Sequence, residues 1–198
     1  MTTQVTYAEA VEMLRLFGSS DMRAPLPIPG EISSKLSSFS TNLLKAKSDD
    51  DQVAARLKEI EDELKACLKA SHEVANTARK QNIQENLPSG GNPDIDAWQK
   101  REKEIDSELS ESEQKCRNKK TDEVAKLLEE HNDSPDIITQ ITEWLADVWE
   151  RIVAALKEVW EAITNFFNKV LDAIISALEY LADLVNDIAN SFAKWVTG

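Results

Sequence analysis

The amino-acid sequence predicts an all-α fold, an elongated bundle of three long helices preceded by a short one. Five glycines and six prolines are confined to a few short places in the 198 residues, which leaves long stretches without a helix breaker. Within those stretches apolar residues recur at helical spacings, and helix-start signals precede them. The expected helices cover about residues 7–17, 31–83, 94–131 and 136–196. The long helices exceed the diameter of a compact domain of this size, which is why we expect an elongated bundle.

The first segment, residues 1–30, combines the short helix with a proline-rich linker. Thr6 and Glu9 have the spacing of a capping box, and Gly18 stands where a glycine often ends a helix. The linker contains Pro25, Pro27 and Pro29, which favour an extended, polyproline-like backbone. We interpret the linker as a stiff spacer in preference to a docking motif.

Residues 31–134 are predicted to form a helical hairpin with a heptad seam. The apolar positions of the first arm are spaced as in a coiled coil or a helical bundle. They are Ile32, Leu36, Phe39, Leu43, Val53, Leu57, Ile60, Leu64, Cys67, Val74 and Ala78. The run Ser48–Asp51 interrupts this seam without changing its phase, so we favour one continuous or slightly kinked helix. The alternative is a break at which Ser48 or Asp49 caps a new helix.

The second arm, residues 94–131, opens with Asn92 as a cap and Pro93 at the first helical position. Its thin seam consists of Trp98, Ile105, Leu109, Cys116, Val124 and Leu127 or Leu128. The short connection makes the two arms antiparallel and should place Cys67 opposite a residue near 110. Cys116 is about six residues from that point, roughly 9 Å along a helix, which is too far for a disulfide. We therefore expect two free thiols, as in a cytoplasmic protein.

The last segment, residues 136–198, has the least ordinary pattern. It begins with the helix-start signal Ser134-Pro135-Asp136 and continues for about 60 residues without a breaker. Its apolar residues repeat every eleven, a period that keeps an apolar stripe nearly straight along a helix. The repeats are Val148, Val159, Val170, Leu181 and Phe192; Ile152, Ile163, Ile174, Val185 and Val196; Leu145, Leu156, Phe167 and Leu178; and Trp149, Trp160 and Leu171. On a helical wheel they span roughly 130°, which is too wide for the seam of a two-stranded coiled coil.

This wide stripe is the candidate binding surface. The two arms of the hairpin offer too little apolar surface to cover it, and exposed apolar patches usually mark a partner or a membrane. Tryptophan serves either as a core residue or as an anchor at a water–lipid boundary. The residues expected to bind lipid or a partner are Trp144, Trp149, Ile152, Trp160, Ile163, Phe166, Phe167, Ile174, Leu178, Phe192 and Trp195.

In period and composition, residues 141–196 resemble the undecad amphipathic helices of exchangeable apolipoproteins, lipid-droplet coat proteins and phage tape-measure proteins. The first two resemblances imply a helix that lies on a lipid surface. Residues 136–196 depart from the lipid-coat pattern because they carry ten acidic and four basic side chains, where those families are usually more basic. A soluble bundle that exposes its last helix also resembles α-helical pore-forming toxins in outline.

Charge and motif content disfavour several classes of function. A net charge of −13 argues against nucleic acids and anionic lipid headgroups as partners. We expect His72 to be a solvated helix residue, the run Asp49–Asp51 to be a helix cap, and the carboxylates to face solvent, away from apolar pockets that would tune their pKa. The sequence has no phosphate-binding loop, nucleophile elbow or metal-ligand set. We therefore expect no enzyme activity, no cofactor and no metal.

The chain has no predicted signal peptide and no predicted transmembrane span. Its first residues lack a basic and an apolar region, and charged residues interrupt every apolar window of about 20 residues. We expect a cytoplasmic protein that associates peripherally with membranes, with leaderless secretion as the alternative.

Two hypotheses of function follow from the wide stripe. In the first, a non-enzymatic protein binds lipid or membrane surfaces through residues 136–198, with a soluble-to-membrane rearrangement like that of pore-forming proteins. In the alternative, a cytosolic coiled-coil scaffold forms a homo-oligomer or binds a helical partner through the same face. An enzyme of unusual chemistry is the least favoured hypothesis.

Overall fold

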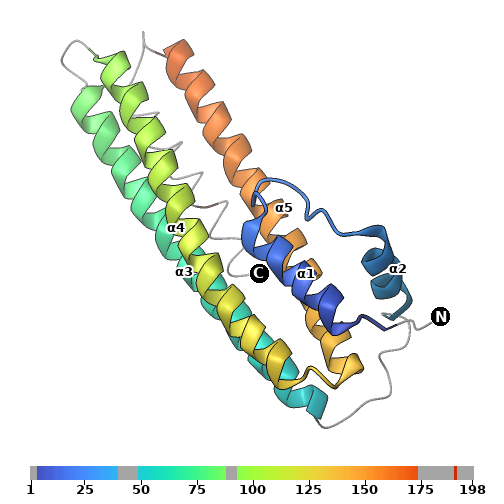
Figure 1. The fold of residues 1–198 in the computed structure, drawn as a ribbon. Helices are drawn as coiled ribbons and strands as arrows, with labels where there is room; N and C mark the ends of the chain where they lie inside the picture. Colours follow the sequence, from blue (N-terminus) through green and yellow to red (C-terminus); the bar gives the residue numbers. More distant parts are fainter. Residues whose placement is uncertain (1–3, 40–48, 88–92, 174–189, 191–198) are drawn as a thin grey trace. The chain divides into compact units, whose positions relative to one another are not determined.

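The computed structural model describes residues 4–39, 49–87, 93–173 and 190. These residues form five helices and no strand: α1 (Tyr7–Ser19), α2 (Gly30–Phe39), α3 (Asp49–Asn86), α4 (Ile95–Glu130) and α5 (Pro135–Ala173) (Figure 1). The prediction of an all-α fold, in which a short helix precedes long ones, is confirmed.

The chain divides into two compact units, which we describe separately. Unit 1 comprises residues 1–64 and 117–153, and unit 2 comprises residues 65–116 and 154–198. Helices α1 and α2 belong to unit 1, whereas α3, α4 and α5 each contribute to both units. The boundaries between the units therefore fall inside the long helices.

Helix α1 begins as predicted and ends later than predicted. The Thr6 hydroxyl accepts a hydrogen bond from the Glu9 amide at 3.3 Å, and the Thr6 amide donates to the Glu9 carboxylate at 2.8 Å, which completes the capping box. The helix continues to Ser19, so Gly18 lies in its last turn and does not cap it. A Cβ atom at Gly18 would come within 3.3 Å of the Thr121 side chain, so glycine here allows α1 to approach α4 closely.

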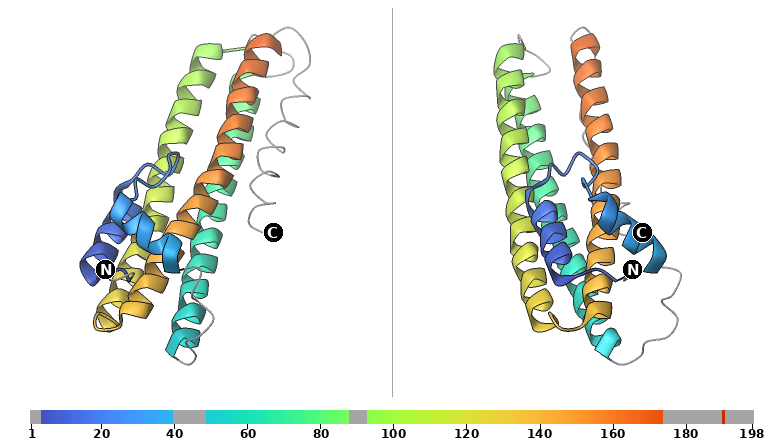
Figure 2. Two further views of the ribbon diagram at one scale, coloured as in Figure 1. Left: turned by 90° about the vertical axis from the view of Figure 1, so that its right-hand side faces the viewer. Right: turned by 45° about the vertical axis from the view of Figure 1, so that its right-hand side comes forward.

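We favoured one helix over residues 31–83. The structure has two helices in this range, α2 and α3. They pack on different partners in unit 1. The Lys35 ammonium of α2 contacts both oxygens of Glu9 in α1 at 2.7 Å, whereas Arg56 of α3 bonds Glu123 of α4 at 3.1 Å. Figure 1 and the right view of Figure 2 show α2 apart from α3. The preserved heptad phase could not reveal this difference, because spacing alone does not identify the surface against which each half packs.

The described part of α3 begins at Asp49, directly after residues 40–48, so the alternative of a break at Ser48 or Asp49 stays a prediction. Ser48 and the predicted seam residue Leu43 lie outside the described residues.

Helices α3 and α4 form the predicted antiparallel hairpin. At its closed end the Asp94 amide donates to the Asn86 carbonyl at 2.8 Å, and the Asp94 carboxylate accepts from the Ala97 amide at 3.0 Å. Asp94 is therefore the N-cap of α4, two residues after the predicted cap Asn92. The seam residues predicted for α4 are all buried: Trp98, Ile105, Leu109, Cys116, Val124, Leu127 and Leu128.

The seam of α3 differs between the two units. In unit 1 the predicted positions are confirmed, because the buried residues include Val53, Leu57, Ile60 and Leu64. In unit 2 the prediction is wrong for Val74, which is 70% exposed. The buried positions there are Leu68, Ser71, His72, Ala75, Asn76, Arg79, Asn82 and Ile83. Apolar spacing could not identify this face because most of its residues are polar.

Helix α5 begins with the predicted signal. Pro135 occupies the first helical position, and the Ile138 amide donates to the Ser134 carbonyl at 3.0 Å. The helix runs without interruption to Ala173 and is the most strongly amphipathic of the five. The remainder of the predicted helix, residues 174–196, lies outside the described residues apart from position 190.

Candidate functional site

The candidate surface is the apolar side of α5, which we call the ridge. Four of the residues predicted to bind lipid or a partner lie on it, namely Trp149, Ile152, Ile163 and Phe166. Its members are each at most 2% exposed: Ile138, Ile141, Leu145, Val148, Trp149, Ile152, Leu156, Val159, Ile163, Phe166 and Val170. The other predicted residues divide into two groups. Trp144, Trp160 and Phe167 are half-buried, whereas Ile174, Leu178, Phe192 and Trp195 lie outside the described residues.

The described part of the ridge is thus covered by the rest of the chain, and the expectation that it would remain uncovered is wrong there. That expectation counted only large apolar residues on the two arms of the hairpin. It omitted α1, and it omitted the aliphatic parts of buried Arg and Lys side chains, which also cover apolar surface.

In unit 1 the ridge centres on Trp149, which is 1% exposed. Its ring meets the edge of Phe17 from α1, with the ring centroids 5.4 Å apart and the planes at 68°. The guanidinium carbon of Arg117 in α4 lies 5.4 Å from the centroid of the same ring, a cation–π distance. The indole Nε1 donates to the Ala24 carbonyl at 3.0 Å. Both the apolar body and the polar atom of Trp149 are therefore satisfied within unit 1.

In unit 2 the ridge residue Phe166 belongs to an aromatic cluster with Phe167 and with Trp98 of α4. Trp98 has ring-centroid distances of 6.1 Å to Phe166 and 5.3 Å to Phe167. The two phenylalanines lie 5.9 Å apart with their rings at 74°. Trp98 and Phe166 are fully buried. This part of the ridge is thus held by apolar and aromatic packing.

The α3–α4 hairpin of unit 2 contains a buried polar layer, and two predictions are corrected here. His72 was expected to be solvated, yet it is 2% exposed and its Nε2 lies 2.7 Å from Glu113 Oε1. The carboxylates were expected to face solvent, yet Glu113 is buried with His72. A buried polar group requires a hydrogen-bonded partner, and each of these two residues provides one for the other.

The second half of this layer centres on Arg79, which has no exposed surface. Its Nη2 donates to Asp106 at 2.6 Å, and its Nε lies 3.3 Å from Glu102 Oε2, an ion pair without hydrogen-bond geometry. Asn82 donates to Glu102 at 2.8 Å. Burial raises the pKa of the Glu102 carboxyl above its ordinary value, and the bond from Asn82 and the charge of Arg79 oppose that rise only in part.

The sequence contained a signal for both buried carboxylates. Glu102 stands four residues after Trp98 and three before Ile105, which is the spacing of the apolar side of α4. Glu113 stands in the same way between Leu109 and Cys116. A search for apolar residues alone overlooks both positions.

A disulfide joins Cys67 of α3 to Cys116 of α4, with the two Cα atoms 5.8 Å apart. The prediction of two free thiols is therefore wrong. The error lies in the register, because Cys116 itself stands opposite Cys67 where a residue near 110 was expected. The contact between His72 and Glu113 gives the same register.

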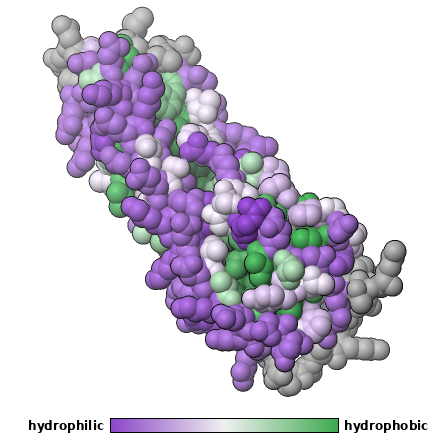
Figure 3. All heavy atoms as spheres, viewed as in Figure 1, coloured by the Kyte–Doolittle hydropathy of each residue, from purple (hydrophilic) through white to green (hydrophobic). Residues whose placement is uncertain are grey.

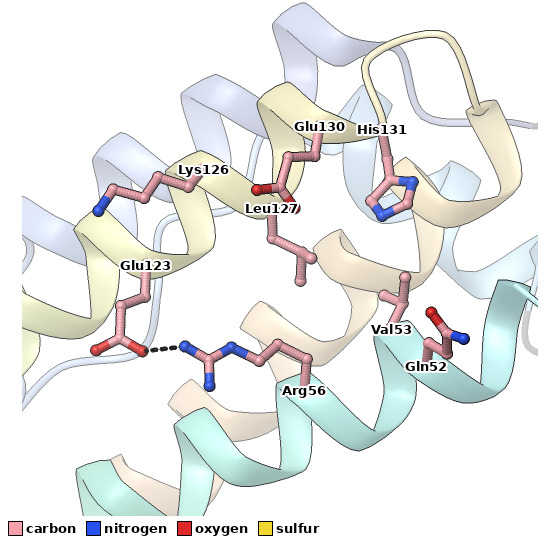
Figure 4. Close-up of a pocket in the computed structure, with 8 residues that line it drawn as sticks. All are labelled: Gln52, Val53, Arg56, Glu123, Lys126, Leu127, Glu130 and His131. Carbon is pink, nitrogen blue, oxygen red and sulfur yellow. Dashed lines mark hydrogen bonds and ion pairs between the residues drawn. The ribbon is translucent and has the colours of Figure 1, made fainter.

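A cavity of about 380 Å³ lies between the beginning of α3 and the end of α4 in unit 1 (Figure 4). Its lining consists of Gln52, Val53, Arg56, Glu123, Lys126, Leu127, Glu130 and His131. Only Val53 and Leu127 are buried, and Arg56 is paired with Glu123. Because its other ionisable groups are exposed or half-exposed, the cavity does not desolvate a candidate acid or base. Among the described residues, no group of three His, Cys, Asp or Glu side chains is placed to hold a metal ion.

The outer surface seen in Figure 3 is largely hydrophilic, with apolar groups gathered over α1. Among the described residues, the large apolar side chains that are exposed are Tyr7, Val11 and Val74. No described helix is long and apolar enough to cross a membrane. No protein-family model, curated protein or solved structure matches this chain. The ridge and the helices that cover it are therefore the features of this chain that bear on its function.

Proposed function

We propose that this protein is non-enzymatic and binds lipid surfaces through the ridge of α5, after α5 separates from the helices that cover it. One observation carries the proposal. In unit 2 the α3–α4 hairpin is closed by contacts between its own two helices: the disulfide, the pair His72–Glu113 and the contacts of Arg79. No ridge residue takes part in these contacts. The departure of α5 would leave them in place.

The two faces that separate would differ in what they require from their new surroundings. The hairpin would expose Trp98, which now contacts Phe166 and Phe167, but most of its unit 2 face consists of polar groups that water can hydrate. The ridge would expose apolar side chains, and burying each large one contributes about 1.5–3 kcal/mol whether the new contact is protein or acyl chain. Lipid can therefore replace the intramolecular contacts of the ridge at little net cost, whereas water cannot.

The charge of α5 indicates the kind of lipid. The described helix carries seven acidic and three basic side chains. An anionic headgroup would repel this outer face, because basic residues are what attract anionic membranes. We therefore propose a neutral or zwitterionic lipid surface as the partner.

The disulfide bears on the compartment. Disulfides persist in oxidising surroundings and are rare in the cytosol. We propose that the protein acts outside the reducing cytoplasm, in contrast to the cytoplasmic location first expected.

Flotation with phosphatidylcholine vesicles tests the proposal. The wild-type chain should float with the vesicles, and the triple variant Trp149→Ala, Trp160→Ala, Phe167→Ala should not. A milder variant, Trp160→Ala alone, should weaken flotation while circular dichroism shows unchanged helicity. The matched control changes the exposed residues Lys157, Glu158 and Glu161 to Ala on the other face of α5 and should float as the wild type does.

Two results would overturn the lipid proposal. One is a wild-type protein that stays with the unbound fraction and forms a discrete oligomer whether or not vesicles are present, which would support the scaffold alternative. The other is a monomer that ignores the vesicles, which would leave both hypotheses unsupported.

A further inference from the structure

Residues 4–24, which we call the N-terminal cover, pack on the unit 1 part of α5. Helix α1 lies beside α5 in both views of Figure 2 and buries Ala10, Met13, Leu14 and Phe17. Of these, Phe17 contacts the ridge directly through its edge-to-face contact with Trp149. The flanking residues Val5 and Met22 are also buried, at 1% and 6% exposure. The cover thus presents a continuous apolar side.

Polar contacts hold both ends of the cover. At one end the Val5 amide donates to the Thr139 hydroxyl at 3.0 Å, and the Gln4 amide group donates to Asp136 at the start of α5. At the other end the Trp149 indole donates to the Ala24 carbonyl at 3.0 Å. Arg117 fastens the same end by donating to the Ser20 carbonyl while its guanidinium lies near the Trp149 ring. Trp149 is therefore the ridge residue that contacts both Phe17 of α1 and the second end of the cover.

The cover depends on this docking for its own structure. Helix α1 has 13 residues, and isolated helices of this length are marginal in water. The segment that follows it, residues 21–30, is mostly exposed and its few backbone contacts include the Ala24 amide on the Asp21 carbonyl at 3.1 Å. An element with such connections can open locally without unfolding the rest of the chain.

We propose that the N-terminal cover is an autoinhibitory element, and that its undocking exposes the ridge around Trp149 to lipid. This inference rests on the proposed function and describes how that function would be regulated. Docked cover and bound lipid compete for the same face of Trp149. The apparent affinity for lipid is therefore reduced by the fraction of molecules in which the cover is closed. A change that weakens docking increases lipid binding even though it leaves every ridge residue in place.

The test uses the full-length chain and two measurements. Phe17→Ala removes the ring that touches Trp149, and Phe17→Leu removes its aromatic edge while keeping most of its volume. The matched control is Val11→Ala, which shortens a residue of the same helix that is 42% exposed. Backbone hydrogen exchange without lipid reports whether α5 is exposed, and flotation with phosphatidylcholine vesicles reports lipid binding.

We expect Phe17→Ala to accelerate exchange of residues 138–153 by on the order of a hundredfold, as the loss of a large buried side chain predicts. Phe17→Leu should accelerate it less, and Val11→Ala should leave it unchanged. Exchange in residues 65–116, which the disulfide and ion pairs hold, should stay as in the wild type. Both Phe17 variants should float with vesicles more completely than the wild type.

The outcomes separate the two proposals. Faster exchange in residues 138–153 without increased flotation supports the cover and overturns the lipid proposal. Exchange that rises no more in the Phe17 variants than in Val11→Ala overturns the cover. If Phe17→Leu accelerates exchange equally throughout the described helices, then α1 is part of one cooperative core and the cover is overturned as well.

Discussion

The two ends of the α3–α4 hairpin close the same pair of helices in different ways. In unit 1 the centre of the seam is apolar, with residues such as Ile60 and Val124 fully buried, and the ion pairs Arg56–Glu123 and Lys120–Glu63 join the two helices beside it. In unit 2 the same two helices meet through Arg79, Glu102, a buried His–Glu pair and a disulfide. Apolar burial is non-directional and tolerates sliding, whereas polar pairs and a covalent bond require one register. The unit 2 seam therefore fixes which residues of α3 and α4 face each other.

The hairpin and α5 also differ in the kind of contacts that they make in unit 2. Among the described residues, the polar contacts of the unit 2 seam join α3 to α4, whereas the contacts of the ridge in that unit are apolar and aromatic. Three measurements test whether the two units differ in this way.

Removing the central cation of unit 2 should have the largest effect. Arg79→Ala leaves Glu102 buried without its ion-pair partner, and breaking a buried pair in this way costs about 3–5 kcal/mol. Urea denaturation measures the loss. The double variant Arg79→Met, Glu102→Leu, which replaces the pair by apolar groups of similar volume, should recover most of it. A loss in Arg79→Ala below about 1 kcal/mol, the value of an exposed pair, would contradict the burial of this seam.

Removing the cross-link should have an intermediate effect. The double variant Cys67→Ser, Cys116→Ser should lose about 2–4 kcal/mol in the free energy of unfolding, as for a typical disulfide. Because the bond lies in unit 2, hydrogen exchange should rise first in residues 65–116. Alkylation checks the bond itself, since the native protein should take up iodoacetamide only after reduction. Labelling of both cysteines without reduction would contradict the disulfide.

The pH dependence of two carboxyls should have the smallest effect and opposite signs. In unit 2 burial raises the pKa of Glu102, so the folded chain holds that proton more firmly than the unfolded chain does. The stability that Glu102 contributes is therefore present below the ordinary value of 4.5 and is lost as pH rises through the folded pKa. Glu102→Gln, which resembles the protonated form, should gain stability relative to the wild type as pH rises from about 4.5.

Glu9 in unit 1 provides the opposite case. Burial raises its pKa, but the bonds from Lys35 and Thr6 outweigh that effect and the net shift is downward. The stability that Glu9 contributes is therefore present above the ordinary pKa of 4.5 and is lost as pH falls through the folded pKa. Glu9→Gln should be less stable than the wild type near neutral pH, and the two should converge in acid. Thermal melts of both variants between pH 3 and 7 measure the slopes, and equal signs would contradict the contrast between the units.

The candidate site was predictable only in part. The undecad spacing identified one side of a helix correctly for Val148, Trp149, Ile152 and Ile163, which all lie on the ridge, whereas Trp160 and Phe167 of the same repeats are half-buried. The spacing did not show that α1 covers Trp149, because nothing in a repeat on α5 specifies its partner. The polar seam was missed for a different reason. His72 and Arg79 have side chains that ordinarily face water, and they are buried here only because Glu113 and Glu102 stand opposite them.

Features that depend on neighbouring residues along the chain could be predicted from the sequence. The capping box of Thr6 and Glu9 and the start of α5 at Pro135 are examples, because a cap satisfies backbone groups within one turn. Tertiary structure alone decided the register of the hairpin, the pairing of Cys67 with Cys116 and the separation of α2 from α3. These depend on which surfaces meet, and a shift of six residues between two helices leaves every local pattern intact. Only the partner side chains across the seam distinguish one such arrangement from another.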